Sequence, residues 1–421
     1  MSIIGAILKR GSIFFMLITI ISLILATLLL FFPFSALIDL HTSQLPFLIA
    51  LAGTAILIVY PLLNGIYLLP LQRLEEKLIP RLIELYRKDR WLNISRFLIF
   101  LFPFFSYLLA GALWGLDIPI KSIILAIWIV AFGIVLDLIR DSLSRTSRFL
   151  NPYNFVDTFV NKAKRSIIVD KDSDLWGSID TLSEIAIRSI KKGKMDLSMQ
   201  VLNAFPPILD VFFVSSKSIT RINQDQEIKK ETGRDEASYT VFYLLQRIEL
   251  INMKALENGL VSICSHIIMI LGKIIAACAK FDLSMVAFPT HVMGKLALKA
   301  LQYQFNEVAA LGTSTLLELA KTIINEIDLS YAELQDPFNA IINNLNYIGQ
   351  ATFKKDKSIN PKLIAQPFRE LKELFQNKKV ESLQDTPIIL QHIDSVLAEY
   401  DILAQVMRTI PSITEEISKE K

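Results

Sequence analysis

Apolar residues fill long uninterrupted stretches in the first third of the chain and recur with helical spacing in the rest. Four segments, at about 12–38, 45–71, 97–116 and 118–136, are each long enough to cross the ~30 Å hydrocarbon core of a bilayer as a helix. No Asp, Glu, Lys or Arg occurs between Gly11 and Ile38 or between Leu45 and Leu71. The pattern therefore predicts a transmembrane domain over residues 1–145.

The charges that flank these segments predict their orientation. Lys9 and Arg10 precede the first segment, whereas the connector at 39–44 contains neither Lys nor Arg. The connector between the second and third segments and the stretch after the fourth are both rich in Lys and Arg. By the positive-inside rule, we expect a multi-pass protein with both its N- and C-termini in the cytoplasm.

Beyond the fourth segment, helical periodicity continues to the end of the chain, and no segment alternates long enough to predict a strand. Helices are predicted at about 179–190, 197–214, 239–256, 260–279, 292–305, 314–327, 332–345, 363–375 and 387–408. The fold class is therefore all-α: four transmembrane helices followed by a cytoplasmic all-helical domain over 151–421. Residues 151–173 are mixed in character and are expected to form a juncture. Residues 217–236 carry many charges without an apolar period and predict an exposed loop.

The helix at 260–279 is apolar enough to be considered as a fifth span. It contains His266 and Lys273, and a charge at the centre of a membrane helix costs about 3 kcal/mol on insertion scales. A fifth crossing would also place the C-terminus outside. We therefore predict a buried core helix of the soluble domain.

A short acidic-Leu-Ser theme recurs in the helical domain, at Asp196, Asp282 and Asp328. The spacings are 86 and 46 positions, near two units and one unit of a helix-pair repeat of about 40–47 residues. One interpretation is a degenerate helical solenoid that presents an interaction surface. The other is that these residues are common helix caps.

The connector after the second span has Leu residues at helical spacing from Leu71 to Leu85. We expect the second span to continue into the cytoplasm as an amphipathic helix, bent near Pro80. This helix either lies on the lipid headgroups or packs against the tail or a neighbouring subunit.

Two groups of residues resemble a known family. The first group is Pro80-Arg81-Leu82 with Arg87-Lys88-Asp89-Arg90, and the second is Leu175-Trp176-Gly177, Glu184-Ile185-Ala186, Arg188, Gly193 and Asp196. Together they resemble a widespread bacterial family of four-span membrane proteins of unknown function. The resemblance covers about 75–200 and implies the four-span architecture in the bacterial inner membrane. It makes Arg81, Asp89 and Arg90 candidates for coupling or lipid contact, and Arg188, Gly193 and Asp196 a candidate tail site.

Polar and small residues within the spans are the remaining candidates. Tyr60 and Asn64 interrupt the second span, and an Asn in hydrocarbon should face protein or water. Gly111 and Gly115 give the third span a small-residue face for close helix contact. These four residues are candidates for a pathway or for helix contacts. At the end of the fourth span, the spacing of Asp137, Arg140 and Asp141 predicts a local ion pair.

Composition adds limits on function. The mean hydropathy of +0.44 suits a membrane protein, and a net charge of +3 gives no nucleic-acid footprint. Nucleotide-binding, hydrolase and metalloprotease motifs are missing, and the four histidines lack metal-ligand spacing, so we expect no enzyme, cofactor or metal. Expected partners are the lipid bilayer, further copies of the chain and a protein on the tail. The sequence favours an oligomeric, channel-like protein with a cytoplasmic regulatory domain; the alternative is a membrane-anchored helical scaffold or sensor.

Overall fold

The computed structural model describes residues 17–31, 44–113, 118–169, 172–222, 228–329 and 333–419, which are helical apart from turns and short connections. The prediction of an all-α fold is confirmed for this part of the chain. The chain divides into two compact units, Met1–Phe155 and Val156–Lys421. This division lies close to the predicted boundary between residues 145 and 151. We call the two parts the N-terminal unit and the array unit.

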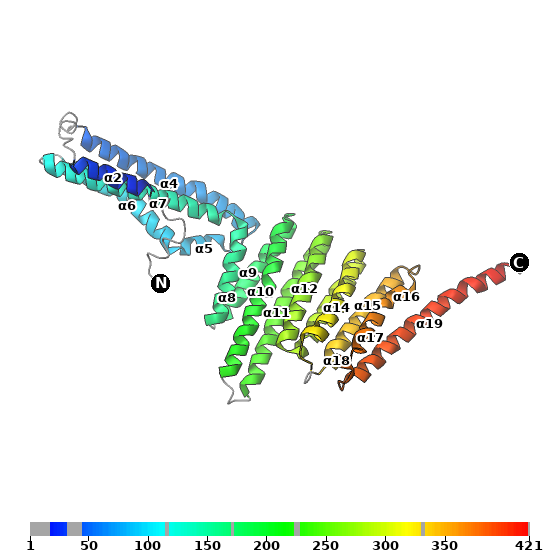
Figure 1. The fold of residues 1–421 in the computed structure, drawn as a ribbon. Helices are drawn as coiled ribbons and strands as arrows, with labels where there is room; N and C mark the ends of the chain where they lie inside the picture. The colour runs from blue at the N-terminus through cyan, green and yellow to red at the C-terminus, as the bar shows by residue number, and fades with distance from the viewer. Residues whose placement is uncertain are drawn as a thin grey trace. The chain divides into compact units, whose positions relative to one another are not determined.

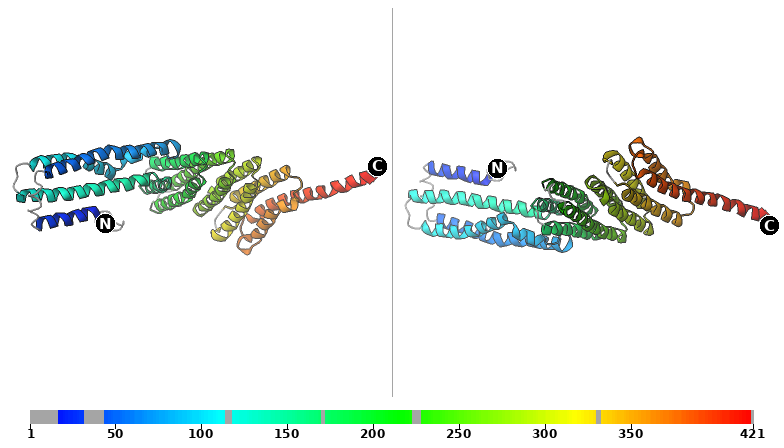
Figure 2. Two further views of the ribbon diagram at one scale, coloured as in Figure 1. Left: turned by 90° about the horizontal axis from the view of Figure 1, so that it is seen from above. Right: turned by 90° about the horizontal axis from the view of Figure 1, so that it is seen from below.

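The N-terminal unit is a set of antiparallel helices (Figure 1). They are α2 (Leu17–Phe31), α4 (Leu45–Lys77), α5 (Leu82–Lys88), α6 (Arg90–Ala112) and α7 (Ile118–Phe149). α4, α6 and α7 share a core that includes Ile56, Ile99, Phe102 and Val135. α2 packs along α7 (Figure 2).

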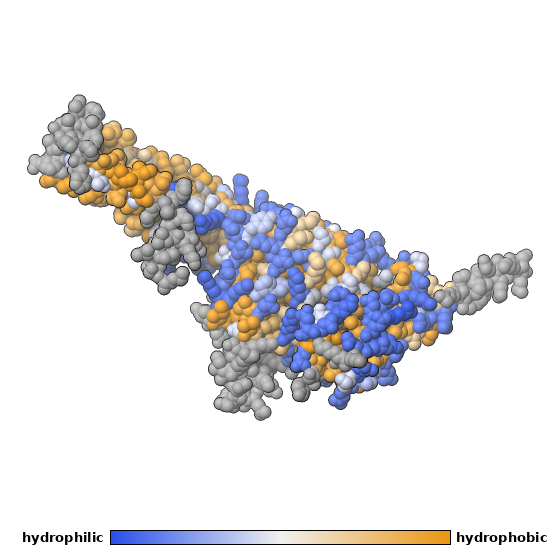
Figure 3. All heavy atoms as spheres, viewed as in Figure 1, coloured by the Kyte–Doolittle hydropathy of each residue, from blue (hydrophilic) through white to orange (hydrophobic). Residues whose placement is uncertain are grey.

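The face of the N-terminal unit that Figure 3 shows is mostly apolar, and many large apolar side chains of α2, α4 and α6 are exposed. By length and composition, the described residues contain five helices that could cross a membrane: α4, α6, α7 and, in the array unit, α10 (Met195–Ile222) and α12 (Val261–Phe281). In α4, α6 and α7 only 22%, 33% and 28% of the most apolar stretch is buried, against 61% in α10 and 50% in α12. α10 and α12 therefore direct much of their apolar surface into a protein core, whereas α4, α6 and α7 direct most of theirs outward.

The helix of the second predicted span extends beyond 71, as expected, but ends at Lys77 instead of bending near Pro80. Proline disfavours helical backbone at the residue before it, here Ile79. Arg81 then takes a left-handed conformation with φ 60° before the short helix α5 begins. The connector is therefore two helices with a sharp break. α6 starts at Arg90 rather than 97, α7 runs on to Phe149, and the ends of the first predicted span lie outside the described residues.

The array unit is a row of paired helices in two layers (Figures 1 and 2). The first layer contains α9 (Asp172–Lys191), α11 (Ile228–Glu257), α13 (Ala287–Gln302), α15 (Gln335–Lys355) and α19 (Thr386–Lys419). The second contains α10, α12, α14 (Asn306–Glu326) and α17 (Gln366–Phe375), with the one-turn helices α16 (Pro361–Ile364) and α18 (Lys378–Glu381) nearby. From α9 to α14, each helix packs against the next helix in the chain and against the next helix in its own layer. This arrangement is that of a helical solenoid.

The same turn joins the two layers in the first three pairs. α9, α11 and α13 each end in a left-handed residue, namely Gly193, Gly259 and Gln304, with φ of 69°, 70° and 67°. At the end of α9, Gly193 N donates to Ile190 O at 3.0 Å and Lys194 N donates to Ser189 O at 2.9 Å, which is a Schellman cap. The ends of α11 and α13 make the same two bonds.

Two expected irregular segments are helical instead. Residues 152–169 form α8 (Pro152–Val169), where a mixed juncture was expected. In the expected loop at 217–236, residues 217–222 belong to α10 and 228–236 to α11, while 223–227 lie outside the described residues. Lys, Glu and Arg are good helix formers, so a charged segment continues a helix that neighbouring apolar residues anchor.

The acidic-Leu-Ser theme follows the array only in part. Asp282 and Asp328 precede α13 and α15, both of the first layer, so their spacing is one helix pair. Asp196 lies in the first turn of α10, a second-layer helix, so the longer spacing covers one and a half pairs rather than two. Asp282 is a cap, because its carboxylate accepts from Ser284 N at 2.9 Å. Both sequence interpretations therefore hold in part: the helices form an array, and the theme serves as a cap at Asp282.

Candidate binding site

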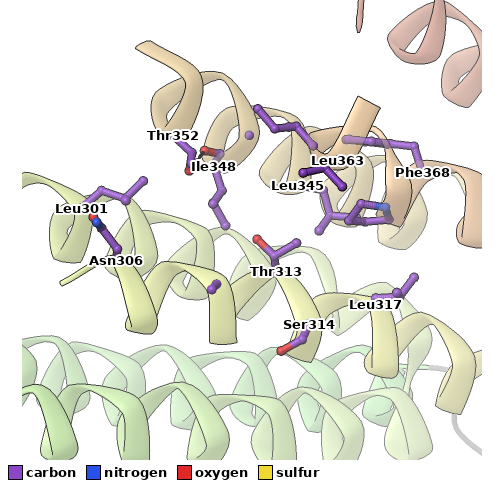
Figure 4. Close-up of a pocket in the computed structure, with 14 residues that line it drawn as sticks. Leu301, Asn306, Thr313, Ser314, Leu317, Leu345, Ile348, Thr352, Leu363 and Phe368 are labelled. Atoms are coloured by element: carbon purple, nitrogen blue, oxygen red, sulfur yellow. Dashed lines mark hydrogen bonds between the residues drawn. The ribbon is translucent and has the colours of Figure 1, made fainter. Parts of the chain in front are cut away.

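One cavity of the array unit is a groove with a volume of about 360 Å³ (Figure 4). Its walls come from α14, α15, α16 and α17 and from the end of α13. Figure 4 shows Leu345 and Ile348 of α15 and Leu363 of α16 around Thr313 of α14. The volume is within the lower range of known ligand pockets.

The groove exists because the fourth helix pair departs from the pattern of the first three. α15 ends in an extended residue, Asp356, instead of a left-handed cap. The second-layer place beside α14 is taken by the short helices α16 and α17, which are separated at Ala365. Phe368 and Leu371 anchor α17 in the core, so the space beside the first half of α14 stays open.

The lining of the groove is apolar in effect. Thr313, Ser314 and Thr352 donate their hydroxyl hydrogens to backbone carbonyls of their own helices, at 3.3, 3.0 and 2.8 Å. These three residues line the groove together with Leu317 and Ile348. A ligand in this groove therefore meets hydrocarbon rather than unsatisfied polar groups.

One end of the groove is basic. Lys355 Nζ lies 3.0 Å from Leu301 O and 2.8 Å from Asn306 Oδ1, and both of these residues line the groove. The segment 354–362 contains four lysines and one acidic residue, Asp356. Hydrogen bonds from Ser358 hold the pKa of Asp356 below its usual range, so its carboxylate stays committed to the turn.

The structure brings two of the candidates on the second and third spans together and leaves a third apart from them. Tyr60 and Asn64 come together on the wall of a small cavity of about 20 Å³, which Arg96 and Thr146 also line. Gly111 is exposed and a Cβ there would meet no atom within 4 Å, so it makes no close helix contact within the unit. Gly115 lies outside the described residues.

Close helix contacts in the N-terminal unit occur at other glycines. A Cβ on Gly53 would lie 2.9 Å from Ser106 Cβ, and one on Gly133 would lie 2.2 Å from Ser22 Oγ. The sequence argument missed them because small residues are common in apolar helices and their neighbours are decided by tertiary packing.

The candidates in the connector have different local roles. Asp89 is the N-cap of α6 and accepts from Trp91 N at 3.0 Å and Leu92 N at 3.2 Å. Arg81 and Arg90 are exposed, and neither makes an ion pair with another described residue of the N-terminal unit. A cap explains why Asp89 is acidic. A coupling or lipid-contact role for the two arginines stays a prediction.

The candidate tail site forms the turn between α9 and α10. Arg188 pairs with Glu184 one turn earlier on α9, Gly193 supplies the left-handed cap, and Asp196 is exposed in the first turn of α10. An acidic residue at this position favours the helix N-terminus. The three residues therefore have structural roles at the connection between α9 and α10.

Two buried carboxylates of α7 tie the N-terminal unit together. Asp137 accepts from Thr19 N at 2.8 Å and Thr19 Oγ1 at 2.6 Å, on α2. Asp141 accepts from Trp91 Nε1 at 2.8 Å and from Arg145 Nε at 2.9 Å. We expected these carboxylates to pair with Arg140. Asp141 pairs instead with Arg145, which lies four residues after it on α7.

The histidines of the array form a pattern that the sequence did not reveal. His266, His291 and His392 each lie within 3.0 Å of an Asn on the neighbouring helix of the same layer, namely Asn203, Asn344 and Asn339. The described residues contain no group of His, Cys, Asp or Glu that could hold a metal ion. These histidines therefore serve as polar links between successive pairs.

No protein-family model and no curated protein matches this chain. Among solved structures, the chain is similar to a circular tandem repeat protein with novel repeat topology and enhanced subunit contact surfaces. The sequence identity is 13% and the TM-score 0.27, over 90% of this chain and 99% of that chain. At that TM-score the likeness carries no argument about this protein.

Proposed function

We propose that the protein is a membrane-anchored scaffold whose helical array docks a partner protein on the cytoplasmic side. The two-layered array is the observation that carries this proposal. A row of stacked helix pairs leaves an extended surface available along its length, which is the usual means by which solenoids bind proteins. Membrane insertion concerns the N-terminal unit and docking concerns the array unit.

The outward apolar side chains of the N-terminal unit support the membrane anchor. Ile66 on α4, and Phe97 and Leu108 on α6, are 62%, 61% and 74% exposed. Soluble proteins rarely leave contiguous apolar surface of this kind uncovered. A bilayer would cover it without further protein contacts.

Antiparallel contacts support the proposed topology. Thr19 meets Asp137 and Ser22 meets Gly133, so the start of α2 lies beside the part of α7 where the predicted fourth span ends. In a bilayer, the N-terminal end of α2 and the exit of the chain toward the array then share one face. This agrees with four spans and both termini in the cytoplasm of a bacterial cell.

Cysteine labelling tests the topology. Cys264 and Cys278 are buried and burial raises the pKa of both thiols to about 12, so their background reaction should be low. A cysteine introduced at Thr42 should react with an impermeant thiol reagent from outside intact cells, and one at Lys229 should react only after lysis. The opposite pattern would refute the anchor as proposed.

The channel-like alternative is favoured by a different observation, the polar interior of the N-terminal unit. Asn64 and Arg96 line its small cavity, and Asp137 Oδ1 is buried without a hydrogen-bond partner among the described residues. Four helices are too few to enclose a pore in one copy, so a channel needs an oligomer. Native mass analysis in mild detergent separates the two: a monomer excludes the channel, whereas an oligomer with ion flux in liposomes would replace the scaffold proposal.

A further inference from the structure

We propose that the groove between α14 and α16 binds a single-chain anionic amphiphile, with its hydrocarbon chain in the groove and its carboxylate at the basic end near Lys355. This site does not depend on the membrane anchor, because every residue that forms it belongs to the array unit. The proposal rests on two separate features, an apolar cavity of limited size and a lysine-rich segment, 354–362, whose Lys355 contacts two residues at one end of the cavity.

The cavity fits one hydrocarbon chain. At about 30 Å³ for each water-sized unit, its 360 Å³ accommodates roughly a dozen heavy atoms. The hydroxyls of Thr313, Ser314 and Thr352 already donate hydrogen bonds within their helices, so an apolar ligand leaves none of these donors unsatisfied.

The lysines supply the second feature. Lys355 Nζ contacts two neutral oxygens, Leu301 O and Asn306 Oδ1, so neither contact neutralises its charge. Lys354, Lys357 and Lys362 are exposed in the same segment. Lys362 is directly followed by Leu363 and Ile364, which line the groove. An anionic head group at this end would meet positive charge while its chain lies against Leu345 and Ile348.

Leu363 also supports an amphiphilic occupant. Its side chain is 69% exposed although it borders the cavity. A chain in the groove would cover it, and removing this apolar surface from water favours binding. The exposed rim and the apolar walls thus belong to one continuous surface.

The test uses the full-length chain in nanodiscs of zwitterionic lipid and two photoreactive probes, a diazirine analogue of dodecanoic acid and the corresponding alcohol. Cross-linked peptides are located by mass spectrometry, and affinity is measured by competition with unlabelled acid. We expect the acid to label peptides that contain 306–317 and 361–368 more strongly than the alcohol does. Labelling confined to the N-terminal unit, or equal labelling by both probes, would overturn the proposal.

Variants locate the chain and the head group. Ala310→Trp places a large side chain in the groove and should reduce labelling by the acid at least tenfold, whereas Ala398→Trp, at an exposed position of α19 outside the groove, should not. Replacing Lys357 and Lys362 by Gln should weaken binding of the acid by about fivefold for each lysine and leave the alcohol unchanged. The same change at Lys191 and Lys192, on the exposed end of α9, is the matched control.

The remaining outcomes contradict the proposal. If the acid labels the Ala310→Trp and Ala398→Trp variants to the same extent, the hydrocarbon chain of the ligand does not lie in the groove. Stronger labelling of the groove by a photoreactive diacyl anionic phospholipid in the nanodisc than by the free acid would identify a membrane lipid as the ligand instead. Protection of the groove by an acidic amphipathic peptide, but not by unlabelled dodecanoic acid, would identify a peptide site.

Discussion

Gly294 is the position at which a single methyl group should most disturb the array. It lies on α13 where this helix packs against α15, and a Cβ at this position would be 1.9 Å from Asn344 Oδ1. Real Cβ contacts essentially never fall under 3.0 Å. The Gly294→Ala substitution therefore forces Asn344 to move or the two helices to separate.

Opposing effects set the magnitude. Ala is favoured over Gly in a helix by about 1 kcal/mol. Against this, moving Asn344 breaks its contacts with Ala340 O at 2.7 Å and His291 Nδ1 at 2.9 Å. A buried amide left unpaired costs about 1–3 kcal/mol, and overpacking adds about 1–3 kcal/mol. The expected net loss in the free energy of unfolding is about 3 kcal/mol, or roughly 6–12 °C in Tm.

Gly177→Ala is the matched control. Gly177 is also inside a helix, α9, but a Cβ there would meet no atom within 4 Å. This variant should be more stable than the wild type by up to about 1 kcal/mol. Thermal and urea unfolding of the array unit, followed by circular dichroism at the helical band, measures both. A Gly294→Ala variant as stable as Gly177→Ala would refute the close packing of α13 on α15.

Three further predictions concern other parts of the chain. The array unit, residues 156–421, should fold when expressed alone, with a strongly helical circular dichroism spectrum and a cooperative melt, because it is compact and holds most of the buried core; a coil spectrum would contradict this. Asp89→Ala should destabilise α6 by about 1 kcal/mol through loss of the N-cap, as seen in the denaturation midpoint, whereas Asp89→Asn should retain most of it. Burial, and secondly the charge of Lys273, lowers the pKa of His266 below 6.5 in the folded state. The contribution of the neutral His266 to stability should therefore be fully present above pH 6.5 and be lost as the pH falls through the folded-state pKa. His266→Gln should flatten that part of the pH–stability curve.

Some properties of this protein follow from the sequence by itself. The spacing of apolar positions predicted most helices, because a helix that buries one face must repeat its apolar residues with the period of the backbone. The acidic residues before helices, such as Asp89 and Asp282, follow from the unsatisfied N–H groups of a helix start. Residues 217–222 and 228–236 were misjudged because their charges hid good helix propensity.

The tertiary structure decided which apolar helices are covered by protein. α4 and α12 have nearly the same mean hydropathy in their most apolar stretches, 2.2 and 2.0, yet 22% of one and 50% of the other is buried. Hydropathy is a property of one segment, whereas burial depends on neighbours from distant parts of the chain. The same reason explains the groove and the pairing of His291 with Asn344, since each requires helices that packing alone brings together.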